Sequence, residues 1–147
     1  MDTLGIKYAT TEKALQSLHQ AIIFFDKAKQ ISDLPLLGTH SEIYQAARDS
    51  VIQRFEFSVE LFWKYIRVFL ETDKQIKLES IAPCDVVRSA CQFRLLNEND
   101  TKHCLDMIKS RNLTSHIYKE DIAEQLARDI PAHYGLMKKI LDALRPV

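Results

Sequence analysis

The eight residues from Arg111 to Tyr118 concentrate most of the chemistry that this chain offers. They include a permanent cation (Arg111), an amide (Asn112), an imidazole (His116) and a phenol (Tyr118). An arginine guanidinium can donate two hydrogen bonds to one phosphate group, and a histidine can take up or release a proton near neutral pH. The segment therefore predicts a site that binds a phosphodiester and moves protons on it.

Helix geometry restricts how Arg111 and His116 can meet. On an uninterrupted α-helix a step of five residues turns about 500°, so the two side chains would point about 140° apart. They converge on one ligand only if the helix ends or bends between them, or if a second subunit completes the site. Thr114 and Ser115 favour an interruption, because their hydroxyls compete for backbone hydrogen bonds. Asn112, four residues before His116, would share its face.

The same segment also has a purely structural interpretation. Arg111 near the end of a helix interacts favourably with the helix dipole. His116 can hydrogen-bond to a backbone carbonyl, and Tyr118 can pack with its hydroxyl exposed. Because polar clusters mark functional sites only part of the time, side-chain chemistry alone leaves both interpretations open.

A second group of polar residues precedes this segment. Glu56, Glu60 and Lys64 follow one another at four-residue intervals, which places them on one face of a helix. They either line a cleft or form an exposed ladder of ion pairs, and the ladder is the simpler explanation.

The cysteines predict neither a metal nor a cofactor. His103 and the three cysteines lack the spacing of a zinc site, so the cysteines are better explained as small buried apolar side chains. The cysteines are Cys84, Cys91 and Cys104.

Composition predicts one domain over residues 1–147. Hydrophobic residues make up 46% of the chain, and only three glycines and four prolines interrupt it, which favours helices over sheets. The formal net charge is zero, which argues against a protein that coats DNA, although residues 101–119 hold four basic residues and one acidic residue. No apolar run is long enough for a signal peptide or a membrane span, so we expect a cytoplasmic protein.

Hydrophobic periodicity and cap residues predict an all-α antiparallel bundle of about five helices. A first helix begins at Thr10 or Thr11, and a second begins at Thr39, which forms a capping box with Glu42. Pro131 is expected to break or kink the last helix. One face of the long second helix should be buried: Phe55, Ser58, Phe62, Tyr65 and Phe69. The expected helices span about 10–30, 39–72, 83–93, 100–111 and 121–144.

Two motifs, in order, resemble those of a known family. Arg111-x-x-x-x-His116 followed by Tyr118 resembles the signature of the HEPN superfamily. The stretch 54–64, Arg-Phe-Glu-Phe-Ser-Val-Glu-Leu-Phe-Trp-Lys, resembles the core of its nucleotidyltransferase substrate-binding branch, and 83–90 resembles the start of that branch's short helix. The chain departs from the branch at 93–96, where a Gly-Leu-Ile-like turn is expected, and at His103, where an aromatic residue is common.

The resemblance implies a four-helix up-and-down core, a homodimer with facing motifs, and a separately encoded minimal nucleotidyltransferase as partner. This chain lacks the Gly-Ser and Asp-x-Asp motif of such enzymes, so we expect it to bind the substrate or to be the substrate. In related toxin–antitoxin pairs the HEPN protein is a ribonuclease, and the nucleotidyltransferase silences it by adenylylating a tyrosine that Tyr118 matches.

Three functions follow. The first is a partner subunit of a minimal nucleotidyltransferase that binds RNA or a nucleotide. The second is a metal-independent endoribonuclease toxin, in which His116 moves protons, Arg111 stabilises phosphoryl charge and Asn112 orients the phosphate or His116. The third is a structural helical interaction module.

Overall fold

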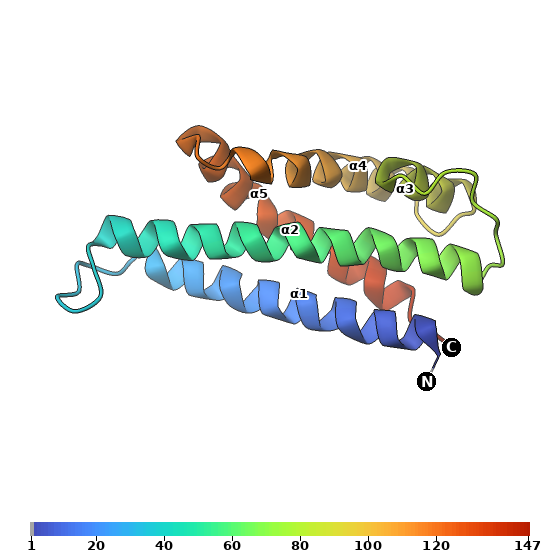
Figure 1. The fold of residues 1–147 in the computed structure, drawn as a ribbon, viewed down its shortest axis with the longest axis horizontal. Helices are drawn as coiled ribbons and strands as arrows, with labels where there is room; N and C mark the ends of the chain where they lie inside the picture. The colour runs from blue at the N-terminus through green and yellow to red at the C-terminus, as the bar shows by residue number, and fades with distance from the viewer. Residues whose placement is uncertain (1) are drawn as a thin grey trace.

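The computed structural model describes residues 2–147 and contains five α-helices and one short 3-10 helix. The order is α1 (Thr3–Ala28), α2 (His40–Thr72), α3 (Pro83–Gln92), α4 (Glu98–Asn112), η1 (Leu113–His116) and α5 (Glu120–Ala143). The four long helices α1, α2, α4 and α5 alternate in direction, and α3 lies beside α4 in the connection from α2 (Figure 1). The predicted all-α antiparallel bundle is confirmed.

The first helix begins seven or eight residues earlier than the sequence indicated. Asp2 caps α1 by accepting a hydrogen bond from the backbone N–H of Gly5. Thr10 and Thr11, which were predicted as caps, lie inside the helix, and their hydroxyls donate to the carbonyl oxygens of the residues four positions earlier. Threonine in a helix interior commonly makes this bond, so a hydroxyl residue alone does not define a start.

The second helix follows the prediction closely. The capping box is present, since the N–H of Glu42 donates to the Thr39 hydroxyl (3.2 Å) and the N–H of Thr39 donates to the Glu42 carboxylate (3.1 Å). All five residues of the predicted buried face are buried. The helix pairs with α1 along its length: Ser58 Oγ lies 3.3 Å from the carbonyl oxygen of Ala14, and Arg54 Nη1 donates to that of Ser17 (2.9 Å).

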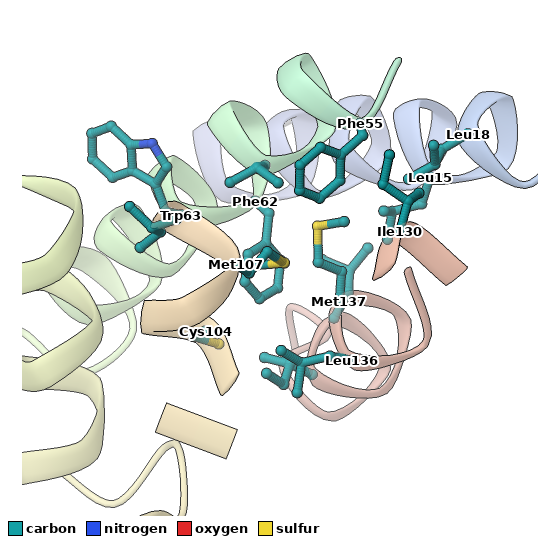
Figure 2. Packing of buried hydrophobic residues seen from close by; sticks show 14 of the residues in the cluster. Leu15, Leu18, Phe55, Phe62, Trp63, Cys104, Met107, Ile130, Leu136 and Met137 are labelled. Carbon is teal, nitrogen blue, oxygen red and sulfur yellow. The ribbon is translucent and has the colours of Figure 1, made fainter. Parts of the chain in front are cut away.

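The core forms where α1, α2, α4 and α5 meet. Figure 2 shows Leu15 and Leu18 of α1, Phe55 and Phe62 of α2, and residues of α4 and α5 around them. Burying one such side chain stabilises the fold by about 1.5–3 kcal/mol. The residues drawn from the last two helices include Met107, Ile130, Leu136 and Met137.

The predicted break at Pro131 is absent from the last helix. Pro131 does not interrupt α5, which continues from Glu120 to Ala143 as one helix. The Pro131 side chain is exposed, while residues on the opposite face are buried among α1, α2 and α4. We infer that this packing outweighs the loss of one backbone donor. Within residues 2–147 no helix is both long and apolar enough to cross a membrane.

Candidate functional site

The predicted site segment lies where α4 ends. The helix stops at Asn112, and the next four residues, Leu113–His116, form the 3-10 helix η1. Arg111 therefore belongs to the last turn of α4, whereas His116 ends η1. The constraint of one continuous helix, which would point the two side chains apart, does not apply here.

Arg111 is held by the two glutamates of α2. Its Nε lies 3.1 Å from Glu60 Oε1, and one terminal nitrogen lies 3.8 Å from Glu56 Oε1. The Nε contact is an ion pair whose geometry does not make a hydrogen bond. Lys64 lies 3.5 Å from the other oxygen of Glu60, one helical turn away. The predicted ladder thus exists between Glu60 and Lys64, but both glutamates also face the motif arginine.

Thr114 joins the same cluster, which sequence reasoning did not foresee. Its hydroxyl is buried, 2.7 Å from Glu56 Oε2 and 2.8 Å from the carbonyl oxygen of Arg111. One hydroxyl therefore ties η1 to both α2 and α4. A threonine inside the motif is the signal that the sequence offers, and by itself it indicates only an interruption of the helix.

His116 and Tyr118 form a separate, exposed pair. His116 Nδ1 lies 3.4 Å from the Tyr118 hydroxyl, and the rings meet edge to face with centroids 5.9 Å apart. Tyr118 is 75% exposed, and the amino group of Lys119 lies 6.0 Å from its ring centre. Among the residues that the structure describes, no hydrogen bond or ion pair links Arg111 to His116, and the side chain of Asn112 makes none.

Arg48, another residue that sequence reasoning missed, fixes the segment that follows Tyr118. It is 3% exposed and lies between α2 and the start of α5. Its guanidinium binds Glu120, Glu124 (2.9 Å) and the neighbouring Asp49 (3.2 Å). Burial acts to lower the pKa of Arg48, but these hydrogen bonds outweigh it and raise the pKa.

The same network holds Glu124. Tyr44 donates a hydrogen bond to its second oxygen (2.8 Å). Burial acts to raise the pKa of Glu124, but the hydrogen bonds from Tyr44 and Arg48 bring that pKa below its ordinary value. The start of α5, two residues beyond Tyr118, is therefore anchored by charge.

Two histidines lie between α4 and α5. His103 Nε2 is 3.0 Å from His133 Nδ1, and His133 stacks on Phe55 (5.4 Å between ring centres). Burial, followed by the nearby His103, lowers the pKa of His133 to about 4. In residues 2–147 no three side chains of His, Cys, Asp or Glu gather as metal ligands.

Comparison with known proteins identifies the family to which this helical bundle belongs. A family described as "Nucleotidyltransferase substrate binding protein like" matches residues 6–146. A crystal structure of a Thermus thermophilus protein is similar over 92% of this chain and 99% of its own, with 31% identity and a TM-score of 0.72. No curated protein matches the chain.

A second solved structure is similar in fold. It is titled as a toxin–antitoxin with AMP-PNP, shares 16% identity, and has a TM-score of 0.69 over 99% of this chain and 100% of its own. The fold is an all-helical bundle, as in these two solved structures. The chain belongs to the family of nucleotidyltransferase substrate-binding-like proteins.

Proposed function

We propose that this chain is the partner subunit of a separately encoded minimal nucleotidyltransferase, in a module of the HEPN–nucleotidyltransferase toxin–antitoxin type. Its Tyr118 hydroxyl is the acceptor of the nucleotidyl group. The single observation that carries this proposal is the exposed His116–Tyr118 pair, in which a phenol faces solvent 3.4 Å from an imidazole nitrogen. Family membership and the likeness to a toxin–antitoxin structure support it.

The chemistry needs a proton acceptor beside the tyrosine. The Tyr118 oxygen attacks the α-phosphorus of a nucleoside triphosphate, the bond to pyrophosphate breaks, and the phenolic proton leaves. His116 Nδ1 is placed to accept that proton. The amino group of Lys119 lies close enough to stabilise the phosphate charge. The partner enzyme supplies the nucleotide site.

Mass spectrometry of the pair tests this proposal. The chain is co-expressed with the minimal nucleotidyltransferase of the proposed pair, and the modified peptide is mapped. We expect AMP on Tyr118 and none in Tyr118→Phe. Tyr134→Phe, which removes a half-buried phenol from α5, serves as the matched control and keeps the modification. His116→Gln should slow transfer by about 100-fold or more, the usual contribution of a general base. An unmodified Tyr118 in an active pair would contradict the proposal.

The second candidate is a metal-independent endoribonuclease. Its support is a hollow of about 400 Å³ that is lined by Arg54, the 49% exposed Phe57 and Glu56, the last of which lies 3.8 Å from Arg111. An exposed aromatic ring next to a guanidinium is a typical stacking platform for single-stranded RNA. The 2′-oxygen would attack phosphorus and the 5′-oxygen would leave, giving a 2′,3′-cyclic phosphate.

This reaction requires both a base and an acid, whereas each chain contributes one motif histidine. A homodimer with facing motifs would supply two, with Arg111 stabilising the phosphoryl charge. Cleavage of a labelled RNA in EDTA tests the candidate: Arg111→Ala and His116→Ala should each lose activity, and light scattering should give the mass of a dimer. If neither RNA cleavage nor modification of Tyr118 is observed, the third function, a structural helical interaction module, is the one that remains.

A further inference from the structure

The turn that carries Tyr118 is closed by one backbone hydrogen bond. The N–H of Lys119 donates to the carbonyl oxygen of His116 (3.0 Å), so Tyr118 lies inside the turn 116–119. Ile117 is partly buried and packs against the core, whereas Tyr118 is largely exposed. The His116–Tyr118 pair therefore projects from a short connection between η1 and α5, and contacts on either side of that connection decide how firmly it is held.

The local sequence does not fix the start of α5. Helices usually begin at a side chain that accepts a hydrogen bond from one of the free backbone N–H groups of the first turn. Lys119 occupies this position in α5, and an ammonium group cannot accept a hydrogen bond. The helix thus begins without a capping side chain, and a tertiary contact has to fix its first turn.

Arg48 of α2 supplies that contact through Glu120, the first residue of α5. Arg48 Nη1 and Nη2 donate to the two carboxylate oxygens of Glu120, the Nη2 bond at 3.3 Å. Such a forked pair fixes orientation as well as distance. Arg48 is buried, so the guanidinium that holds Glu120 has little freedom of its own. Glu120 follows Tyr118 by two residues, which places their Cα atoms at most about 8 Å apart.

The connection has a second anchor on the same helix. The hydroxyl of Thr114, two residues before His116, donates to Glu56 of α2 (2.7 Å). Glu56 follows Arg48 by eight residues, which is about 12 Å along α2. The connection is therefore tied to one helix on both sides, and Tyr118 lies between the two ties. Attachment on both sides restricts the directions in which the Tyr118 hydroxyl can point.

This restriction matters for transfer of a nucleotidyl group to a phenol. Reacting atoms must lie about 3–3.5 Å apart and in line, and a misplacement of about 1 Å can lower the rate about 100-fold. In the proposed reaction the partner enzyme holds the nucleotide, so the rate depends on how precisely this chain presents its hydroxyl.

We propose that Glu120, held by Arg48, is a positioning residue that presents the Tyr118 hydroxyl to the nucleotide. It touches neither the nucleotide nor the tyrosine and acts by fixing the backbone two residues beyond Tyr118. This inference rests on the proposed function.

The test compares two variants of the first turn of α5. Glu120→Gln removes the charged fork, while Arg48 keeps Glu124 and Asp49 as partners, so the fold should be unchanged by circular dichroism. Asp121→Asn is the matched control. It removes the same charge from the same helical turn, but Asp121 is exposed and forms no ion pair in the described part of the chain.

Transfer kinetics give the first measurement. With the purified nucleotidyltransferase of the proposed pair, kcat for AMP transfer to Tyr118 should fall about tenfold in Glu120→Gln. The KM for the chain should change by less than about twofold, because a partner protein contacts a surface much larger than one turn. A mere loss of folded chain would instead raise the apparent KM and leave kcat unchanged. Asp121→Asn should match the wild type in both constants.

Hydrogen exchange in the free chain gives the second measurement. The amide hydrogen of Lys119 bonds to His116 and reports opening of the turn. It should exchange about fivefold faster in Glu120→Gln, as suits loss of a partly exposed ion pair, and at the wild-type rate in Asp121→Asn.

A double variant shows whether Glu120 acts through Arg48. In a chain that already carries Arg48→Met, Glu120→Gln should slow transfer no further, because the two residues form one contact. A full additional loss of rate would mean that Glu120 acts without Arg48 and would overturn the inference.

The remaining outcomes separate this inference from the proposed function. If wild-type Tyr118 is modified and Glu120→Gln reacts at the wild-type rate, or if Asp121→Asn slows transfer equally, the positioning role is wrong and the proposed function stands. Unchanged exchange of the Lys119 amide in Glu120→Gln also overturns the positioning role. If that exchange quickens but no AMP appears on wild-type Tyr118, the tether exists, and the acceptor proposal falls together with any role of Glu120 in transfer.

Discussion

Arg111 of α4 and Glu60 of α2 form an ion pair, with Nε 3.1 Å from Oε1, although the residues are far apart in the sequence. The arginine predicted to bind a phosphate thus already has a carboxylate partner. A phosphodiester must compete with Glu60 for the guanidinium. Solvent weakens the ion pair between Arg111 and Glu60, because both side chains are about one-third exposed.

Removing the Glu60 carboxylate, which competes with RNA phosphates for Arg111, should strengthen RNA binding. Glu60→Gln removes the closer of the two carboxylates at Arg111 and leaves Glu56, and we expect the affinity for a labelled single-stranded RNA to rise about fivefold, as suits a partly exposed ion pair. Fluorescence anisotropy measures it. Glu71→Gln is the matched control, because it removes the same charge from the same helix but releases Arg67 instead. An equal gain in both variants would show that only net charge matters.

Arg48 should matter more for stability than the surface ion pairs. Arg48→Met leaves Glu120 and Glu124 without their shared buried partner, and we expect a loss of about 2 kcal/mol in the free energy of unfolding, moderated because both carboxylates reach solvent. Urea titration followed by circular dichroism measures this. Arg88→Met, which removes an exposed pair with Asp85, should change the free energy by less than about 0.5 kcal/mol.

A lysine at position 48 should not restore the stability that Arg48 provides. Its single ammonium group cannot reproduce the forked contacts to Glu120, Glu124 and Asp49. Arg48→Lys is expected to recover less than half of the lost stability. Full recovery would mean that charge alone, without geometry, anchors the start of α5.

The sequence predicts local features of this fold well. The capping box at Thr39 and Glu42 needs only two residues of one turn, and the buried face from Phe55 to Phe69 needs only helical periodicity. The start of α1 was misplaced because threonine hydroxyls serve equally well inside a helix. The break at Pro131 was wrong because tertiary packing along α5 decides continuity, and no local pattern reports it.

Sequence reasoning named some residues of the candidate site but not Thr114 or Arg48, and it did not predict how the residues pair. Arg111, His116 and Tyr118 carry recognisable chemistry, but their partners come from another helix or from a turn. Arg48 did leave a signal, since it lies four residues after the half-buried Tyr44 and four before the buried Ile52. Its partners in α5, Glu120 and Glu124, lie more than 70 residues away, and no spacing rule could identify them.

The three thiols should differ in reactivity. Cys104 is buried, and burial raises the pKa of its thiol to about 12, so almost none of it is thiolate at pH 8. Cys84 and Cys91 are half-buried. A disulfide reagent should modify two thiols quickly and the third about a hundredfold more slowly or worse, at a rate limited by opening of the fold. In urea all three should react together. Equal rates in the native protein would contradict the packing of α4.

Acid should destabilise the protein through His133. Its pKa is about 4 in the native state because of burial and His103, opposed by Asp129 and Asp106, against about 6.5 for an ordinary histidine in the unfolded chain. Between these pH values the unfolded state binds more protons, so the stabilisation is complete above pH 6.5 and is lost as pH falls toward 4. The loss reaches at most about 3 kcal/mol.

Urea titrations at several pH values between 7 and 4 test this dependence. We expect the free energy of unfolding of the wild-type chain to fall by up to about 1.4 kcal/mol per pH unit below 6.5 from this residue. His133→Asn keeps a polar atom facing His103 but cannot titrate, so its slope should be smaller even though its smaller side chain lowers stability at every pH. Leu36→Ala, which changes an exposed residue that carries no ionisable group, should retain the wild-type slope. If His133→Asn also retains it, the acid sensitivity comes from the carboxylates instead, most directly from Glu124, whose lowered pKa loses its stabilising effect as pH falls through that value.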